Sequence, residues 1–268
     1  MMAPMTLYKY LHPSKLSLLL QNKLLLTPAR YLNDPLEFFV RTEDFTDEEL
    51  KHHFELYERS GPKPNGYEQL SPDLKWTLFL MAIRREEFAA QEATDMREGL
   101  SGELGILSLT EEPCNQLMWS HYTESGKGVA VGLFVGEEEN RHGLLARPCS
   151  FGLAIKVTYS DEVTKLKTDF SNSAHVFCSK RLAWEYEREW RVIKALNEAE
   201  GVQQNDTLLY TLSFMPEHLA TIIFGLSTSQ ELRSQIKKQF HSSSYPNVML
   251  QEVFLDWRTA AISLRPVQ

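Results

Sequence analysis

The sequence predicts an α+β fold, in which a mixed or antiparallel sheet, continuous or split, forms the core. Two observations favour this class. Patterns with helical spacing gather before Gly99 and strand-like runs dominate after it, whereas a doubly wound parallel sheet would alternate them. No boundary is sharp enough to separate two independent domains, so residues 1–268 are predicted to form a single domain. A helical insert is expected near residues 46–98, within the outer bounds 44–99.

The part of the chain before Gly99 is predicted to contain short strands and most of the helices. Ser71-Pro72 supplies an N-cap followed by proline at the first helical position, which begins the longest helix. The apolar spacing of that helix predicts that one side of it packs on the sheet. In chain order the elements are strand 7–10, helix 13–22, strand 24–27, a turn at 33–35, and helices 46–58 and 72–98.

The part after Gly99 is predicted to supply most of the sheet. Its apolar runs are short, rich in β-branched residues and bounded by turn-forming residues. Thr228-Ser229-Gln230-Glu231 has the pattern of a capping box, which predicts the start of the last helix. Strands are expected at 105–109, 127–134, 153–159, 189–196, 208–213, 220–224, 248–255 and 260–264, and helices at about 114–122, 174–185 and 229–241.

The composition is typical of a soluble globular protein. Hydrophobic residues make up 43% and charged residues 24% of the 268 residues. No apolar run reaches the roughly 18 residues that span a bilayer, so no membrane partner is expected. Cys114, Cys149 and Cys178 are widely spaced, which argues against a disulfide framework or zinc ribbon and favours a reducing cytoplasm. The net charge of −8 disfavours nonspecific binding to nucleic acids.

The segment 184–191 concentrates charge and aromatic rings. Because side chains alternate between the faces of a strand, an extended reading places Glu185, Glu187, Glu189 and Arg191 on one face and the aromatic residues on the other. Stacked carboxylates repel one another unless a cation or a ligand lies opposite. A solvated edge strand that uses its charges to prevent aggregation is an equally good reading.

Other polar and aromatic motifs are candidates for a site, although familiar nucleotide and hydrolase signatures are missing. Each has a purely structural alternative: an edge strand, a turn, ordinary core packing, or a solvated lysine beside a core tryptophan. The motifs are Tyr8-Lys9-Tyr10, Asn33-Asp34-Pro35-Leu36-Glu37, Met118-Trp119-Ser120-His121-Tyr122, and Lys180 with Trp184.

Taken in this order, the motifs resemble those of a bacterial family, the domain of unknown function numbered 2971. The resemblance runs from residue 7 to about residue 225 and names no activity. The other residues that carry the resemblance are Leu107-Ser108-Leu109-Thr110, the glycines Gly126 and Gly128, and Glu187, Glu189, Trp190 and Arg191, which follow Lys180 and Trp184.

The layout also resembles that of ADP-ribosyltransferases, whose split sheet binds NAD without a Rossmann motif. This resemblance implies an NAD-dependent, ADP-ribosyltransferase-like enzyme of bacterial origin, acting as a toxin or a defence effector. Glu189 would stabilise the oxocarbenium-like transition state, as carboxylates do in glycosidases. Glu187 would orient or deprotonate the acceptor, which is a protein or a nucleic acid, and His121 or Lys9 would hold ribose or phosphate. The residues expected to bind the nucleotide-like cofactor are Tyr8, Lys9, Asn33, Asp34, Glu37, Trp119, Tyr122, Lys180 and Arg191, with no metal ligand.

Two other classes of function remain open from the sequence. A magnesium-dependent nuclease or phosphodiesterase would use carboxylate ligands from Asp34, Glu37, Glu187 and Glu189 and a phosphate contact from Lys180. A sensor without chemistry would build an aromatic pocket from Trp119, Tyr122, Trp184 and Trp190. All three readings share one geometric prediction: Glu187 or Glu189 should lie near Tyr122, His121 and the 33–37 turn.

Overall fold

The fold is described from a computed structural model of the chain. It describes residues 5–34, 36–38, 40–41, 46–83, 95, 98–99, 102–135, 154–162, 164–165, 176–204, 206–240 and 244–267. Cys149, most of 84–98 and part of the expected 153–159 strand lie outside these ranges. No helix in the described ranges is both long and apolar enough to cross a membrane.

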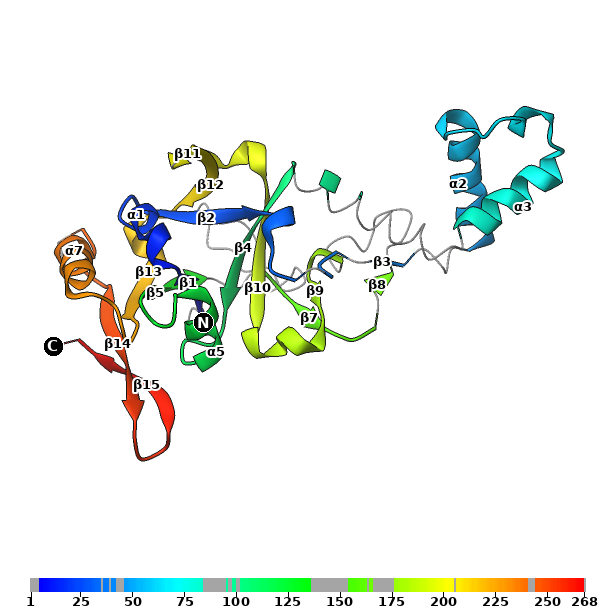
Figure 1. The fold of residues 1–268 in the computed structure, drawn as a ribbon. Helices are drawn as coiled ribbons and strands as arrows, with labels where there is room; N and C mark the ends of the chain where they lie inside the picture. Colours follow the sequence, from blue (N-terminus) through cyan, green and yellow to red (C-terminus); the bar gives the residue numbers. More distant parts are fainter. Residues whose placement is uncertain are drawn as a thin grey trace.

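A large, mostly antiparallel sheet organises the molecule, as the α+β prediction requires (Figure 1). Its strands follow the order β11-β12-β2-β4-β1-β5-β13-β14-β15, and β10 joins β4 to β6. The pairing of β13 with β14 is parallel, so the sheet is mixed. The strands are β1 Met5–Leu11, β2 Lys23–Pro28, β3 Val40–Arg41, β4 Leu104–Thr110, β5 Val129–Val135, β6 Ala154–Lys156, β7 Thr158–Tyr159, β8 Thr164–Lys165, β9 Ser179–Lys180, β10 Glu189–Ala195, β11 Glu200–Gln204, β12 Thr207–Ser213, β13 Leu219–Phe224, β14 Met249–Asp256 and β15 Ala261–Pro266.

The sheet opens between β1 and β4, near its middle. These two strands pair only at Tyr8 and Thr110, whereas β1 pairs with β5 along its whole length. Beyond that point β4 instead pairs with β2, through Ile106 and Gly105. The gap between β1 and β4 is therefore bordered by three strands, β1, β2 and β4, and side chains from each of them can line it.

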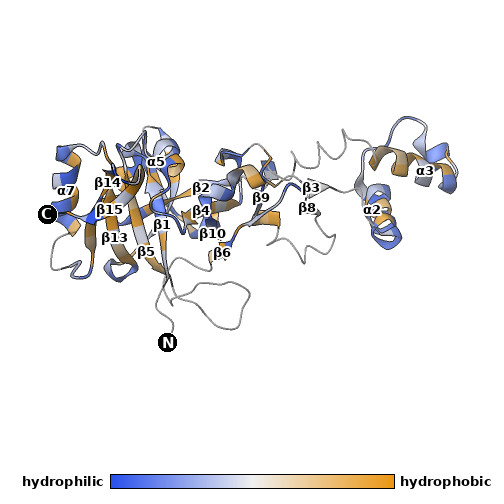
Figure 2. Ribbon diagram, turned by 90° about the horizontal axis from the view of Figure 1, so that it is seen from below, coloured by the Kyte–Doolittle hydropathy of each residue, from blue (hydrophilic) through white to orange (hydrophobic). Residues whose placement is uncertain are grey.

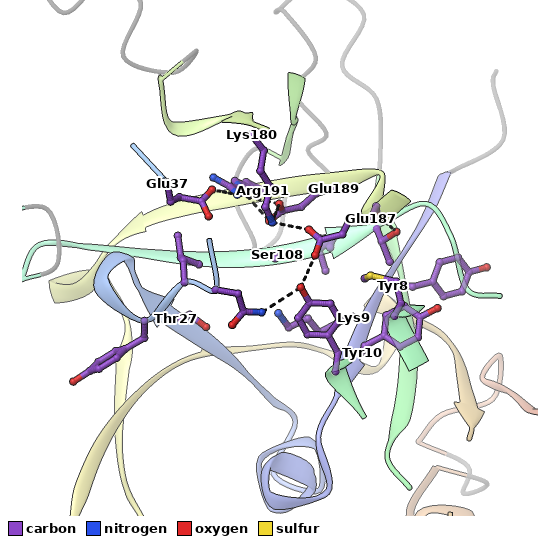
Figure 3. Close-up of a pocket in the computed structure, with 17 residues that line it drawn as sticks. Tyr8, Lys9, Tyr10, Thr27, Glu37, Ser108, Lys180, Glu187, Glu189 and Arg191 are labelled. Atoms are coloured by element: carbon purple, nitrogen blue, oxygen red, sulfur yellow. Dashed lines mark hydrogen bonds and ion pairs between the residues drawn. The ribbon is translucent and has the colours of Figure 1, made fainter. Parts of the chain in front are cut away.

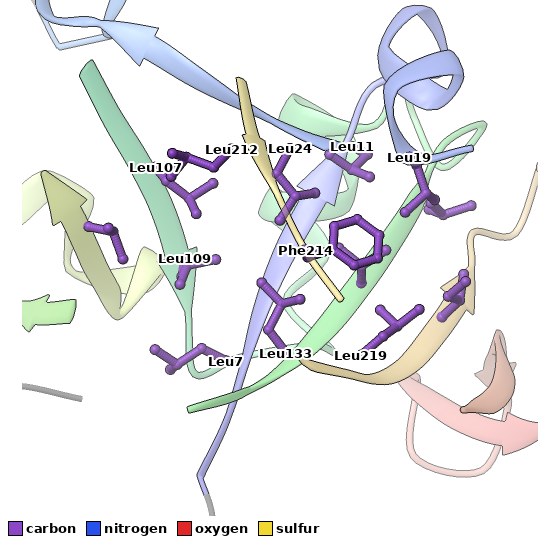
Figure 4. Close-up of a cluster of buried hydrophobic side chains, with 14 of the residues drawn as sticks. Leu7, Leu11, Leu19, Leu24, Leu107, Leu109, Leu133, Leu212, Phe214 and Leu219 are labelled. Carbon is purple, nitrogen blue, oxygen red and sulfur yellow. The ribbon is translucent and has the colours of Figure 1, made fainter. Parts of the chain in front are cut away.

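The core lies mainly on one face of the sheet (Figure 4). Leu7 and Leu11 of β1 alternate with Tyr8 and Tyr10, as expected for a strand with one apolar face. Helix α7 (Gln230–Phe240) adds Ile236 and Phe240 to the same cluster. Hydrophobic residues are concentrated along the central strands (Figure 2), so burial of apolar surface holds the strands around the gap in place.

The opposite face carries a second, more polar layer. Helix α5 (Gln116–Tyr122) places Met118 and Trp119 against Tyr10, Ala130 and Ile223. Asn115 caps this helix, because its side-chain oxygen accepts hydrogen bonds from the backbone of Leu117 and Met118. The predicted helix at 114–122 is thereby confirmed, and it lies beside the polar edge of β1.

The helices mostly follow the sequence prediction. The segment 13–22 contains a 3₁₀ turn (Pro13–Lys15) and helix α1 (Leu16–Leu19), and α2 spans Asp47–Ser60 behind a capping box formed by Thr46 and Glu49. Helix α7 starts after Ser229, whose hydroxyl accepts from the Leu232 amide. The Thr228 hydroxyl bonds the Gly128 carbonyl instead, so the expected capping box is wrong in detail.

Helix α3 (Pro72–Ile83) does not pack on the sheet as its apolar spacing predicts. Its Leu78 and Met81 are 41% and 61% exposed. Its aromatic side chains contact α2, where Phe54 lies 5.2 Å from Trp76 and 5.3 Å from Phe79 between ring centroids. The two helices thus pack on each other, apart from the sheet (Figure 1).

The extended reading of 184–191 is wrong for its first half. Residues Leu182–Glu187 form a 3₁₀ helix, and β10 begins only at Glu189. Between them Arg188 has a φ of 43°, and this left-handed conformation changes the direction of the chain. The expected helix at 174–185 is also wrong, because Ser179–Lys180 pairs as strand β9 with β7. Glu185 is therefore exposed, while Glu187, Glu189 and Arg191 are buried.

Candidate functional site

A pocket lies in the gap between β1 and β4, under the 3₁₀ helix that precedes β10 (Figure 3). It has a volume of about 190 Å³. The pocket is lined by three consecutive residues of β1: Tyr8, Lys9 and Tyr10. The side chain of Lys9 extends from the opposite face of the strand to those of the two tyrosines. All three can line the pocket because β1 borders a gap rather than a continuous sheet. The remaining lining residues are Thr27, Tyr31, Leu32, Asn33, Glu37, Ser108, Leu109, Thr110, Met118, Tyr122, Lys180, Glu187, Glu189 and Arg191.

Arg191 is the buried centre of one half of the site. Its Nε and Nη2 donate to the two carboxylate oxygens of Glu189 at 3.0 and 2.9 Å. Nη2 also bonds Glu37, and Nη1 donates to the Phe177 carbonyl at 2.7 Å. Arg191 is 0% exposed, so this fork ties the turn at 33–37 to strand β10 inside the protein.

Lys180 joins this cluster to the second carboxylate. Its Nζ lies 2.6 Å from Glu187 Oε2 and 3.2 Å from Glu189 Oε2. The other oxygen of Glu187 accepts from the Tyr122 hydroxyl, and Asn33 Nδ2 donates to that hydroxyl at 3.2 Å. The expected convergence of Glu187 with Tyr122 and the 33–37 turn is therefore confirmed, but His121, expected in the same group, does not line the pocket.

The two glutamates differ in how fully their oxygens are occupied. Glu189 receives donors from Arg191, Lys180 and Ser108. Among the described residues, Glu187 receives only the Lys180 amine and the Tyr122 hydroxyl. A carboxylate offers about four lone-pair sites, so Glu189 is saturated whereas Glu187 can accept further hydrogen bonds.

The pKa values follow from this burial and pairing. Burial would raise the pKa of Glu189, but the charges of Arg191 and Lys180 hold it at about 2. Burial likewise raises the pKa of Glu37, and here the charge of Arg191 opposes the shift without reversing it. Burial and the neighbouring Glu187 raise the pKa of Tyr122, so its hydroxyl remains protonated and donates at neutral pH.

Lys9 stands apart from the ion-pair network. Within the described ranges, no hydrogen bond or ion pair holds its amine. Burial lowers the pKa of Lys9 to about 8, although the charges of Glu189 and Glu187 act in the opposite direction. Lys9 lines the pocket from β1 and Glu187 from the end of the 3₁₀ helix (Figure 3), so the site combines a carboxylate with spare acceptor capacity and an uncommitted amine.

Three residues predicted for the site lie elsewhere. Asp34 does not line the pocket, and its Oδ1 accepts from the Leu36 amide at 2.9 Å, as in a simple turn. Trp119 is 4% exposed, donates to the Pro113 carbonyl and packs edge-on against Tyr10. His121 is exposed outside the pocket, with Nδ1 3.3 Å from the Tyr186 hydroxyl. The order of the motifs therefore predicted the region of the pocket, but not which side chains of each motif line it.

Several lining residues were missed as site candidates. Ser108 and Thr110 face Arg191 and Glu189 across the β4–β10 pairing, and Thr27 comes from β2. Tyr31 lies at the mouth and is 63% exposed. The alternation of residues 105–109 could have assigned Ser108 to a polar face. The local sequence, however, does not indicate that β2 and β10 both pair with β4.

Metal binding has little support from the described residues. Among them, no group of three or more histidine, cysteine, aspartate or glutamate side chains is arranged to hold a metal ion. The oxygens of Glu189 that the nuclease reading assigns to Mg²⁺ accept hydrogen bonds from Arg191 and Lys180. The metal-dependent alternative therefore stays a prediction from the sequence alone.

Comparison with known proteins identifies one family. The family model described as "Protein of unknown function (DUF2971)" matches residues 118–192, which contain the Met118–Tyr122 motif and the Lys180–Arg191 segment. The earlier motifs at 8–10, 33–37 and 107–110 lie outside that match. No curated protein and no solved structure matches the chain. The resemblance drawn from the motifs is thus confirmed for residues 118–192, which match the DUF2971 family model.

Proposed function

We propose that the protein cleaves the nicotinamide–ribose bond of NAD and transfers ADP-ribose, with Glu187 as the catalytic carboxylate. The observation that carries the proposal is the state of Glu187: it is buried in the pocket, fixed by Lys180 and Tyr122, and still able to accept hydrogen bonds. A preorganised carboxylate of this kind stabilises an oxocarbenium-like transition state and can bond a ribose hydroxyl.

The roles of the two glutamates are exchanged relative to the sequence prediction. Glu189 is neutralised by Arg191 and Lys180, so it has little charge to offer a substrate. We assign it to positioning: it holds Lys180, which in turn fixes Glu187. Glu187 takes the electrostatic role that the sequence prediction gave to Glu189.

The size and lining of the pocket suit part of a dinucleotide. Pockets that enclose a drug-sized ligand measure roughly 300–1,000 Å³, whereas this cavity measures about 190 Å³. We place nicotinamide and its ribose inside, against the rings of Tyr8, Tyr10 and Tyr122, with the rest of NAD at the mouth near Tyr31. In a bacterium, transfer to a protein or nucleic-acid acceptor would make the protein a toxin or a defence effector.

The test compares nicotinamide release from NAD by the wild type, Glu187→Gln and Glu185→Gln. Glu185 lies in the same 3₁₀ helix but is exposed, so its variant is the matched control. We expect Glu187→Gln to lose about a hundredfold or more in rate, because an amide cannot supply the negative charge. The control should retain the wild-type rate, and melting temperatures should show that both variants are folded.

A second candidate is a binding module without turnover, favoured by the charge balance of the pocket. The pocket lining contains equal numbers of acidic and cationic side chains: Glu37, Glu187 and Glu189 against Lys9, Lys180 and Arg191. A wild-type protein whose melting temperature rises with NAD, but which releases no nicotinamide, would replace the transferase proposal with this one.

A further inference from the structure

Lys9 is the pocket residue that the proposed mechanism does not use. Its strand, β1, is fixed by full-length pairing with β5 and by the buried Leu7 and Leu11 on either side of Lys9. The amine of Lys9 is therefore held in the gap by a rigid strand. Lys180 and Arg191, the other two cations of the lining, are held by carboxylates, whereas no partner holds Lys9 within the described residues.

Lys9 is only half-buried, yet a partly desolvated amine without a partner is still costly unless the site uses it. A role in charge balance alone would predict an ion pair, as Lys180 forms with Glu187 at 2.6 Å. The lowered pKa of Lys9, about 8, also means that an appreciable fraction of the amine is neutral just above neutral pH. A neutral, desolvated lysine amine is a nucleophile.

We infer that Lys9 is itself an acceptor: the protein transfers the ADP-ribosyl group of NAD to the Lys9 amine. The inference rests on the proposed function and names the acceptor for it. The bond between the ribose C1′ and the nicotinamide nitrogen breaks, and its electron pair leaves with nicotinamide. The lone pair of the Lys9 amine bonds C1′, and the proton released from that nitrogen passes to Glu187 or to water.

The geometry gives this reaction an advantage over transfer to water. The ribosyl carbon would lie between the strand that carries Lys9 and the segment that carries Glu187, since both line one cavity of about 190 Å³. Holding a nucleophile inside such a cavity replaces a bimolecular encounter by an intramolecular one. One ADP-ribosyl group per chain is the expected limit, because the modified lysine fills the pocket.

The test incubates the full-length protein with NAD and measures two quantities, nicotinamide release and the mass of the intact protein. Peptide mapping then locates any modification. Lys9→Met removes the nucleophile and keeps a similar side-chain length. Lys127→Met is the control, because Lys127 is exposed and pairs with Glu124 outside the pocket. We expect one ADP-ribosyl adduct on Lys9 in the wild type and in Lys127→Met, and none in Lys9→Met.

The two proposals fail in different ways. Nicotinamide release without an adduct, or with an adduct on any other residue, would overturn the role of Lys9 and leave the cleavage reaction standing. Absence of nicotinamide release from every protein would overturn the proposed function and this inference with it. An adduct that persists in Lys9→Met would also exclude Lys9 as the acceptor.

Discussion

The carboxylate of Glu189 is held inside the fold by two cationic side chains. It is buried, and its charge is matched by Arg191 and Lys180, which hold its pKa at about 2 against the ordinary value of 4.5. Breaking a buried pair usually costs more than the pair itself contributes, because the remaining charges stay buried and unpaired. The stability of the fold around the pocket should therefore depend on Glu189 being ionised.

Glu189→Gln should lower the free energy of unfolding by about 3 kcal/mol at neutral pH, since a depression of this size corresponds to about 1.4 kcal/mol for each pKa unit. The folded pKa lies below the unfolded one, so the wild-type advantage is fully present above pH 4.5 and shrinks as the pH falls toward 2. Urea unfolding of both proteins across this range is the measurement. Exposed Glu185→Gln serves as control, and a wild-type advantage independent of pH would contradict the assignment.

Among the secondary-structure elements, β5 begins at a point where the chain packs closely against the end of β1. A Cβ on Gly128 would lie 2.0 Å from the Leu11 carbonyl oxygen and 3.1 Å from the Thr123 Cβ. The Gly128 carbonyl also accepts from the Thr228 hydroxyl at 2.7 Å. Three segments thus meet at a position where only glycine fits, and this close contact fixes the end of β1 that borders the pocket.

Gly128→Ala should destabilise the fold by about 2–3 kcal/mol, because the Leu11 backbone and the Thr123 side chain leave the added methyl group little room. Gly102→Ala is the matched control, since the nearest atom to a Cβ there is 3.9 Å away. Urea unfolding should separate the two variants clearly. Equal stabilities would mean that β1 and β5 can move apart at little cost, against the packing described here.

The sequence predicted most elements but not how they pair. Short apolar runs rich in β-branched residues located β4, β10 and β13. The alternation of aromatic and charged residues at 184–187 was misleading, because the backbone there forms a 3₁₀ helix. The left-handed Arg188 that ends this helix carries no composition signal, since arginine is not a typical residue for that conformation.

At the scale of the whole molecule, the pocket depends on pairings between segments that are far apart in the chain. Glu37 and Arg191 are 154 positions apart, and Tyr122 and Glu187 are 65 apart. The motifs indicated that these residues belong together, but only the divergence of β1 from β4 explains why they enclose a cavity. That divergence comes from β2 pairing with β4, a competition between strands that local patterns do not encode.

The helices α2 and α3 pack on each other, apart from this sheet. The contacts of this helical pair are mainly rings from its own two helices, among them Phe54, Trp76 and Phe79, while Leu78 and Met81 stay exposed. A unit with so few buried side chains should open independently of the sheet.

Trp76→Ala should therefore speed amide exchange throughout α2 and α3, because it removes the ring that contacts both Phe54 and Phe79. Exchange in β4 and β10 should stay at the wild-type rate, and so should nicotinamide release if the protein has the proposed activity. Exchange followed by mass spectrometry measures both regions in one experiment. Faster exchange in β4 or β10 would show that the helical pair supports the pocket, and the insert would then have to be counted as part of the site.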